Sequence, residues 1–161
     1  MKLKKMILIL LPIIAVIFLF MTGQKEEPFI RILTAKDQHV AESNFIYNHP
    51  DAILFPAVVR SSGQKPVETS YKGIELSKLF SSLDIELSNI EKVTFNAADG
   101  YRVILSIEEL KEPGNTYLTF ERNGAHLKSK KQGGSGPFQL VIRRDPFSQR
   151  WIKHVDEIIL E

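Results

Sequence analysis

The sequence predicts an α+β domain with a mixed β-sheet and few short helices, preceded by one N-terminal apolar helix. Residues 93–105 alternate apolar and polar side chains on both sides of Asp99-Gly100, as in a β-hairpin. Within residues 76–83, leucine and phenylalanine recur at i, i+3, i+4 and i+7, the spacing of a short amphipathic helix. The other apolar runs are short and end at Gly- or Pro-containing turns, as strands do.

Residues 1–23 have the composition of a membrane leader. Lysines at positions 2, 4 and 5 precede an apolar run from Met6 to Met21. As a helix, Met6 to Gly23 would extend roughly 27 Å, near the lower limit for crossing a bilayer. Signal peptidase sites need small residues, whereas Met21 stands three residues before a cut after Gly23. We therefore expect an uncleaved signal anchor, with a cleaved signal peptide as the alternative; a lipoprotein is excluded because the chain has no cysteine.

The lysines before the apolar run predict that the N-terminus stays in the cytoplasm. The chain is then a single-pass protein of the cell membrane with its C-terminal domain outside the cytoplasm, or a secreted protein if the leader is cleaved. Residues 24–28 are polar, end in proline and are expected to be a tether. Residues 29–161 form the predicted domain.

Composition excludes several classes of function. Without the three leader lysines, the 21 basic residues become 18 against 19 acidic ones, a net charge of −1. Nucleic-acid binders carry a basic stripe, so no nucleic-acid partner is expected. The absence of cysteine excludes disulfides, thiolate metal ligands and thiol nucleophiles.

The first half of the domain is predicted to open with a strand at residues 29–34. Residues 35–51 are too weakly patterned to assign. A strand at residues 53–60 contains Pro56, which favours an edge position or a bulge. A loop and a strand-like segment follow, and Gly73 is expected to break the chain before the helix of residues 76–83.

The second half begins with the hairpin of residues 93–105. Ser106 and Glu109 then form a capping-box pattern that starts a helix of one or two turns, ended by Pro113-Gly114. Asn123-Gly124 is a tight-turn sequence. Residues 128–136 are basic, rich in glycine and expected to be mobile. Further strands are predicted at residues 116–122, 138–142 and 151–160.

Five motifs in a fixed order carry a family resemblance: Tyr71-Lys72-Gly73-Ile74-Glu75-Leu76, Ala98-Asp99-Gly100-Tyr101, Glu121-Arg122-Asn123-Gly124-Ala125-His126-Leu127, Gly136-Pro137 and Arg150-Trp151-Ile152-Lys153. This series resembles the oxidoreductase molybdopterin-binding domain, which is the catalytic domain of the sulfite oxidase family and of the periplasmic methionine-sulfoxide reductase catalytic subunit. The similarity extends from about Val58 to Ile159. It implies the sulfite oxidase type of fold for the domain.

The resemblance also implies a site, with one departure. In that family a cysteine on the loop before the first motif coordinates molybdenum, which soft thiolate ligands suit. The matching loop here, Arg60-Ser61-Ser62-Gly63, presents only hydroxyl groups. Family members also hold the pterin phosphate with a basic residue beside the late tryptophan. Arg150 occupies that place and Lys153 is close, so an anion could still be bound by charge-assisted hydrogen bonds.

The predicted ligand- or cofactor-binding residues are therefore Arg60, Ser61, Ser62, Arg143, Arg150 and Lys153. Each has a plainer interpretation: residues 60–63 suit an ordinary turn, and the arginines suit a solvated, partly salt-bridged face. Asp99-Gly100 is explained by the hairpin turn alone, and Tyr101 and Trp151 are expected in the core rather than as ligand platforms. No catalytic residue is predicted, and the four histidines lack the spacing of a metal site.

Two hypotheses of function follow. The favoured one is a membrane-anchored, cysteine-free binding module without a bound cofactor, whose partner is a small anionic ligand or a membrane or envelope protein. The alternative is a molybdopterin-dependent oxidoreductase acting on sulfite or a sulfoxide, which holds its cofactor without a protein thiolate. A purely structural role, with the pocket filled by side chains, is a third reading.

Overall fold

The structure is a computed structural model that describes residues 27–161. The predicted leader and the first part of the tether lie outside the described residues. Within residues 27–161, none of the helices combines the length and the apolar character needed to span a bilayer.

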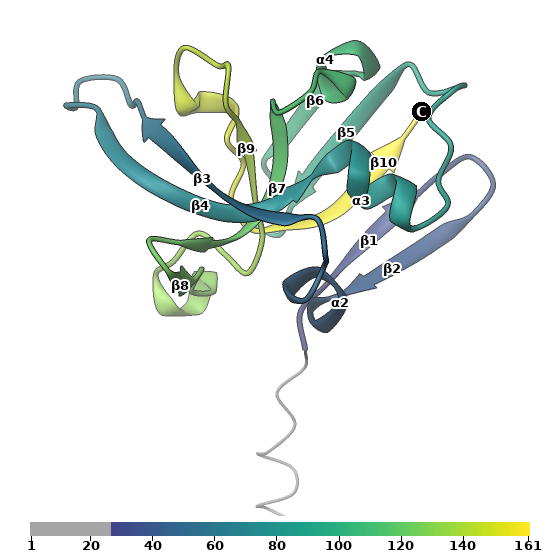
Figure 1. Cartoon of the computed structure of the whole chain (residues 1–161), viewed down its shortest axis with the longest axis horizontal. Helices are drawn as coiled ribbons and strands as arrows, with labels where there is room; N and C mark the ends of the chain where they lie inside the picture. Colours follow the sequence, from purple (N-terminus) through teal and green to yellow (C-terminus); the bar gives the residue numbers. More distant parts are fainter. Residues whose placement is uncertain (1–26) are drawn as a thin grey trace, which may run out of the picture.

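The domain contains two five-stranded sheets (Figure 1). The first has the strand order β2-β1-β10-β5-β6, in which only the β1–β10 pair is parallel. Its strands are β1 (Phe29–Leu33), β2 (Gln38–Glu42), β5 (Lys92–Ala97), β6 (Arg102–Ser106) and β10 (Val155–Leu160). This sheet joins the two ends of the described chain, because the first strand pairs with the last.

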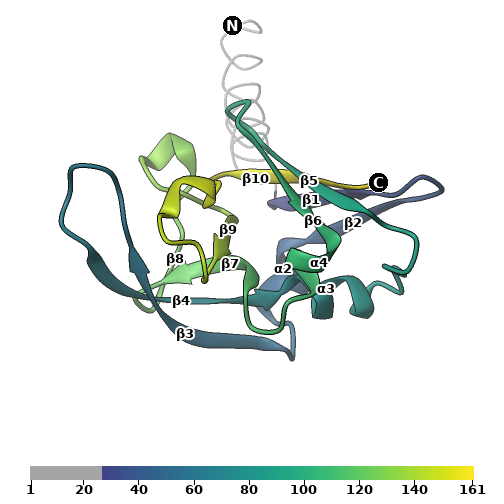
Figure 2. The ribbon, with the colours of Figure 1, turned by 90° about the horizontal axis from the view of Figure 1, so that it is seen from above.

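The second sheet has the order β3-β4-β7-β8, and β9 also pairs with β7. Its strands are β3 (Ala52–Val59), β4 (Val67–Glu75), β7 (Thr116–Arg122), β8 (Ala125–His126) and β9 (Gln139–Ile142). Figure 2 shows β10 and β4 running along opposite sides of the domain, with the β3–β4 hairpin projecting away from the remaining elements.

The helices are short: α2 (Ser43–Tyr47), α3 (Leu76–Ser82), α4 (Ile107–Lys111) and the 3-10 helices η1 (Lys130–Gln132) and η2 (Ser148–Arg150). The buried residues Leu76, Leu79 and Phe80 confirm the predicted apolar face of α3. Ser106 caps α4 by accepting a hydrogen bond from the backbone N–H of Glu109 at 3.2 Å. Half of the predicted capping box is therefore confirmed, while the carboxylate of Glu109 has another partner, described below.

One apolar core is shared by both sheets and by α2, α3 and α4. Its largest fully buried side chains include Tyr71, Phe80, Phe95, Phe120 and Phe138. Burying an aromatic or large aliphatic side chain of this kind contributes about 1.5–3 kcal/mol to folding, which explains how the domain is stable without disulfides.

The predicted hairpin is confirmed as β5 and β6, whose register places Phe95 opposite Val103. The strand containing Pro56 is confirmed as β3, an edge strand that pairs only with β4 among the described residues. An edge position suits proline because its missing N–H costs no ladder hydrogen bond there. The tight turn is confirmed as well, because Asn123 and Gly124 both have positive φ.

The expectation that Gly73 breaks the chain is wrong. β4 continues through Gly73, with a register shift against β7 between Lys72 and Gly73. A Cβ atom at Gly73 would lie 2.8 Å from Thr119 Cα and would collide with the carbonyl oxygen of Leu118. Glycine is required here because two strands approach closely, and no turn is formed.

Two other expectations need correction, and the structure also describes residues 35–51, which the sequence left unassigned, and residues 128–136. Residues 35–51 contain β2 and α2, which are too short and polar to show a period. Residues 128–136 form a hydrogen-bonded loop around η1, with a capping box between Ser129 and Gln132. The last strand begins at Val155 rather than at position 151. Tyr101 lies outside the core, with 54% of its surface exposed, whereas Trp151 is buried as expected.

Candidate functional site: a cationic pocket beside the second sheet

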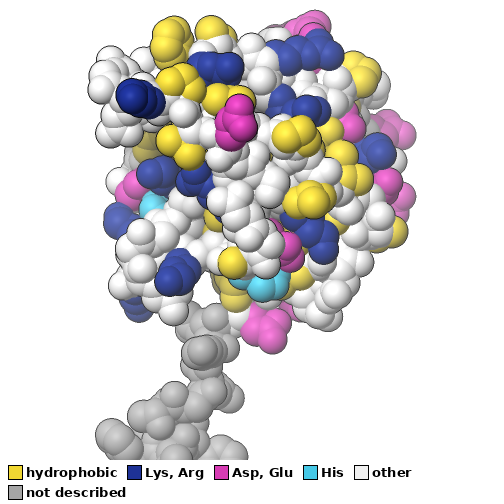
Figure 3. Space-filling model, turned by 60° about the vertical axis from the view of Figure 1, so that its left-hand side comes forward, with side chains coloured by type: hydrophobic (Ala, Val, Ile, Leu, Met, Phe, Trp, Pro, Cys, Tyr) yellow, Lys and Arg dark blue, Asp and Glu magenta, His cyan; other side chains and the backbone are white. Residues whose placement is uncertain are grey.

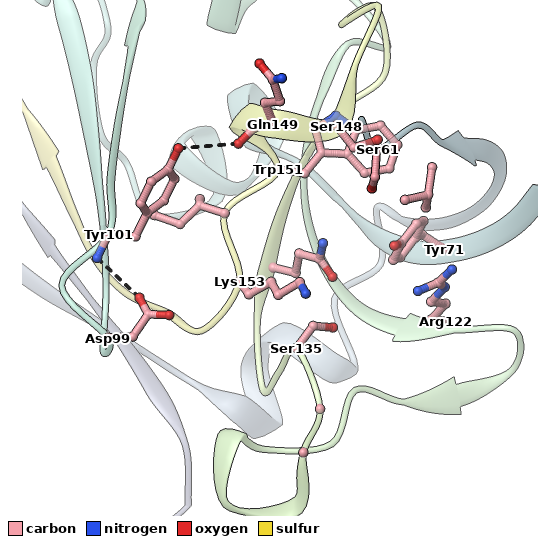
Figure 4. Close-up of a pocket in the computed structure, with 15 residues that line it drawn as sticks. Ser61, Tyr71, Asp99, Tyr101, Arg122, Ser135, Ser148, Gln149, Trp151 and Lys153 are labelled. Atoms are coloured by element: carbon pink, nitrogen blue, oxygen red, sulfur yellow. Dashed lines mark hydrogen bonds between the residues drawn. The ribbon is translucent and has the colours of Figure 1, made fainter. Parts of the chain in front are cut away.

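A pocket of about 550 Å³ lies beside the second sheet; we call it the central pocket (Figure 4). The end of β3 and strands β4, β7 and β9 contribute Val59, Tyr71, Arg122 and Gln139. Four further segments complete it: Ser61, the hairpin turn with Asp99 and Tyr101, residues 133–135, and residues 148, 149 and 151–153. The pocket therefore collects side chains that are far apart in sequence.

Two cations face this pocket without a carboxylate partner. Arg122 Nε donates to Thr69 Oγ1 at 2.9 Å, and its guanidinium group lies 5.6 Å from the centre of the Tyr71 ring. Lys153 is exposed on the loop after η2. Within residues 27–161, neither side chain takes part in an ion pair. The one carboxylate that lines the pocket is that of Asp99, so the pocket carries net positive charge.

Gln139 is the buried polar group of the central pocket. It is only 4% exposed, and its Oε1 atom is the one buried side-chain nitrogen or oxygen without a hydrogen-bond partner among the described residues. Leaving a buried acceptor unpaired costs about 1–3 kcal/mol. Such a group is uncommon in folded proteins, and either the adjacent Tyr71 hydroxyl or a bound molecule can supply the missing donor.

Tyr71 lies against the same part of the pocket and is almost fully buried. Burial raises the pKa of Tyr71 above its ordinary value of 10.0, and the nearby charge of Arg122 and the side chain of Gln139 oppose this shift. At neutral pH its phenol is therefore protonated and available as a hydrogen-bond donor.

The rim of the pocket is held by the β5–β6 turn. Asp99 Oδ1 accepts a hydrogen bond from the backbone N–H of Tyr101 at 3.2 Å, and the Tyr101 hydroxyl donates to the carbonyl of Gln149 at 3.5 Å (Figure 4). The exposed Tyr101 ring thus bridges the hairpin and η2. This contact explains why an aromatic residue expected in the core lies at the surface.

A second pocket, of about 410 Å³, lies between the end of β3 and the loop after β9; we call it the arginine pocket. It is lined by Arg60, Arg143 and Arg144 together with Pro113 and Trp151. Arg143 lies over the Phe55 ring at 5.2 Å and donates to the carbonyl of Gly114 at 3.3 Å. Arg144 is ion-paired with Glu112.

Arg150 lines neither pocket. Its guanidinium donates to Glu109 Oε2 at 3.1 Å and Oε1 at 2.6 Å, and its Nε donates to Asp145 Oδ2 at 3.0 Å. These two carboxylates raise the pKa of Arg150 above its ordinary range. With both carboxylates bound, the guanidinium has little capacity left for an external anion.

The six predicted residues are thus divided between different places. Ser61 and Lys153 line the central pocket, and Arg60 and Arg143 line the arginine pocket. Ser62 lines neither, and Arg150 is held by carboxylates. The backbone of Arg60 joins the two regions, because its N–H donates to Ser148 Oγ at 3.0 Å and its carbonyl accepts from the Ser148 N–H at 2.9 Å.

The sequence prediction missed Arg122 and Gln139. Arg122 was present only as a member of a motif, with nothing to separate it from an ordinary surface cation. Gln139 did carry a signal: all four residues of β9 are buried, and it is the one polar residue among them. A glutamine within a short apolar run indicates a polar site inside the fold.

The residues present do not fit a molybdenum centre of the family's kind. The loop at Arg60–Gly63 has serines, the whole chain lacks cysteine, and a neutral hydroxyl is a poor substitute for a thiolate. No group of three or more His, Asp or Glu side chains within residues 27–161 is arranged to hold a metal ion. The central pocket instead offers two cations, the single carboxylate of Asp99 and neutral hydrogen-bonding groups, a set that suits an anion.

One face of the domain shows how its charged side chains are distributed. Figure 3 shows Lys and Arg side chains dispersed among acidic and uncharged ones on the face that is turned forward.

Comparison with known families and proteins identifies similar folds but does not identify a function. No protein family matches the sequence, and no curated protein matches it either. Among solved structures, the sulfane dehydrogenase SoxCD from Paracoccus pantotrophus is similar in fold, with a TM-score of 0.67 and 17% sequence identity. The match covers 85% of this chain but only 39% of that chain. Identity this low shows the fold alone: the chain shares its α+β fold with part of that protein.

Proposed function

We propose that the chain is a membrane-anchored extracytoplasmic module that binds a small anionic ligand in the central pocket and has no redox chemistry of its own. The proposal rests on one observation. Arg122 and Lys153, two cations without a carboxylate partner, line the same pocket as Gln139, whose buried Oε1 atom has no hydrogen-bond partner. The apolar leader supports the membrane location through its composition.

The chemistry of the lining defines the ligand. Arg122 and Lys153 favour a phosphate, sulfonate or carboxylate group, which they would hold by charge-assisted hydrogen bonds. Gln139 Oε1 is an acceptor and can take an N–H or O–H group from the same molecule. A volume of about 550 Å³ suits a small organic molecule rather than a bare ion. The ligand class is therefore an organic anion with a hydrogen-bond donor at some distance from its charge.

Binding is favoured over catalysis because the pocket lacks the donor set that the fold's redox relatives would need. The likeness to SoxCD supports the scaffold, and its dehydrogenase activity is not transferred to this chain. Purified full-length protein should accordingly contain no stoichiometric molybdenum. Elemental analysis that finds one molybdenum per chain would refute the non-catalytic proposal and favour the oxidoreductase alternative.

Titration of the full chain in detergent with glycerol phosphate, followed by calorimetry, tests the anion site. Arg122→Met and Lys153→Met should each weaken binding roughly 10- to 150-fold, because a charge-assisted hydrogen bond contributes roughly 1.5–3 kcal/mol. Lys65→Met, which removes an exposed cation on the β3–β4 loop, is the matched control and should bind as the wild type does. Equal affinity in all four proteins would exclude the central pocket as the anion site.

A further inference from the structure

The described chain begins in a groove formed with the basic loop of residues 128–136. This N-terminal groove, of about 550 Å³, is lined by residues 27–29 and Arg31 on one side and by Lys130 and Lys131 on the other. Figure 1 shows the start of β1 and the loop beside β8 on the same, lower side of the domain. The groove is separate from the central pocket, although the loop contributes to both.

The loop presents its lysines in a fixed arrangement. Lys128, Lys130 and Lys131 are exposed, and within residues 27–161 none of them forms an ion pair. The Ser129–Gln132 capping box holds η1, and the Gly134 N–H donates to the Ser129 carbonyl at 3.0 Å. The backbone of Lys128 packs directly on Gly134, where a Cβ atom would collide with it.

Chain length restricts where this groove can lie. The predicted anchor ends at Gly23, and four residues of extended chain reach at most about 14 Å. If the leader spans the membrane, Glu27 and the groove around it therefore stay within about 14 Å of the bilayer surface. That is comparable to the distance over which surface charges act in physiological salt.

We infer that this face of the domain docks on anionic lipid headgroups, with Lys128, Lys130 and Lys131 as the contacting charges. The groove also contains two acidic side chains, Glu27 and Asp156, and its Arg31 is ion-paired with Glu157 at 3.4 Å. Arg31, Lys130 and Lys131 still outnumber the acidic side chains of the lining by one, and Lys128 adds a further charge on the adjoining loop. Phe29, which is 49% exposed beside them, supplies an apolar side chain that can insert at the boundary between headgroups and acyl chains. The inference depends on the membrane anchor of the proposed function but not on its anion pocket.

The cysteine-free chain allows a direct test, because a single introduced thiol is labelled uniquely. Ala98 is exposed and lines the groove, whereas Gln64 is exposed on the distant β3–β4 loop. Full-length Ala98→Cys and Gln64→Cys proteins carry a fluorophore and are placed in nanodiscs with headgroup-spin-labelled lipid as the quencher. The discs contain either phosphatidylcholine alone or phosphatidylcholine and phosphatidylglycerol in equal amounts.

We expect the Ala98 label to be quenched more strongly in the anionic discs than in the neutral ones, and the Gln64 label to be unaffected by lipid charge. Each lysine near an anionic surface raises the ratio of docked to free protein roughly fivefold. The double variant Lys130→Glu/Lys131→Glu should therefore lower that ratio roughly 25-fold or more. Added salt should have the same effect, while soluble glycerol phosphate at matched ionic strength should not compete.

Several outcomes would overturn the inference: quenching at Ala98 that ignores lipid charge, an unchanged docked fraction in the double variant, or stronger quenching at Gln64. Competition by soluble glycerol phosphate would assign the lysines to a soluble anion instead of a lipid surface. Release of the chain from membranes by alkaline carbonate would reject the anchor together with the docking. Calorimetry of the double variant with glycerol phosphate reports on the central pocket alone. It therefore distinguishes a failure of lipid docking from a failure of anion binding in the central pocket.

Discussion

The guanidinium of Arg150 donates hydrogen bonds to both carboxylate oxygens of Glu109, although the two residues are 41 positions apart. This bidentate contact joins α4 to η2, and Asp145, whose side chain is only 8% exposed, accepts from the same guanidinium. The residue expected from the family resemblance to hold a phosphate is therefore used to fix two loops together.

Arg150→Ala should consequently reduce stability without reducing anion binding. We expect a loss of about 1–3 kcal/mol, since Asp145 is left buried without its partner while the more exposed Glu109 contact is partly screened. Denaturant unfolding measures the loss, and calorimetry with glycerol phosphate measures affinity. A large drop in affinity in protein that remains folded would restore the original assignment of Arg150 as the anion ligand.

Gln139→Leu should weaken binding without reducing stability, which is the reverse of the result expected for Arg150→Ala. Replacing an unpaired buried acceptor by an apolar group of similar size removes a cost, so the free protein should be equally stable or up to about 1 kcal/mol more stable. Binding of an organic anion with a donor group should weaken about tenfold. The pair of measurements is thermal unfolding of the free protein and calorimetry. A clear loss of stability would mean that Oε1 already has a partner in the free protein.

Gly73→Ala should destabilise the second sheet severely, by about 3 kcal/mol or more, because the new Cβ has no space against Leu118 and Thr119. Gly63→Ala is the matched control. Gly63 has a φ of 72°, but a Cβ there would meet nothing within 4 Å, so only backbone strain of about 1 kcal/mol is expected. Chemical unfolding of both variants gives the comparison. Equal losses would contradict the close approach of β4 and β7.

Tyr71 should make stability fall with rising pH in the alkaline range. Its folded-state pKa is raised above 10.0, so the folded state keeps a proton that the unfolded state has lost between the two pKa values. The contribution of the neutral phenol is fully present below pH 10.0 and is lost as pH rises through the raised pKa. Tyr71→Phe should flatten this part of the curve of unfolding free energy against pH. An unchanged slope in the variant would show that another group causes the decline.

Periodicity predicted the elements that bury a regular apolar face. The β5–β6 hairpin, α3 and the edge strand β3 all follow from spacing and from the positions of Gly and Pro, because burial on one face fixes the pattern. β2 and α2 were not predicted, since a five-residue element gives too few repeats to establish a period. Gly73 was misassigned because its cause, the backbone of β7, is more than 40 residues further along the chain.

The candidate site was less predictable than the fold. Ser61 and Lys153 were anticipated from the resemblance, but Arg122 and Gln139 reach the same pocket from β7 and β9, and only the strand pairing brings them near Tyr71. Local sequence also could not show that Arg150 faces Glu109 while its neighbour Trp151 lines the pockets. Both facts depend on tertiary contacts, which have no short-range signature in the sequence.

Trp151 forms part of the wall of both pockets and is held there by a hydrogen bond from its indole N–H to the carbonyl of Ile142 at 2.8 Å. It is also the sole tryptophan of the chain. Intrinsic emission excited at the red edge of the protein absorption band therefore originates from one rigid indole between the two cavities. Its intensity and wavelength give an unlabelled optical signal of occupancy on either side.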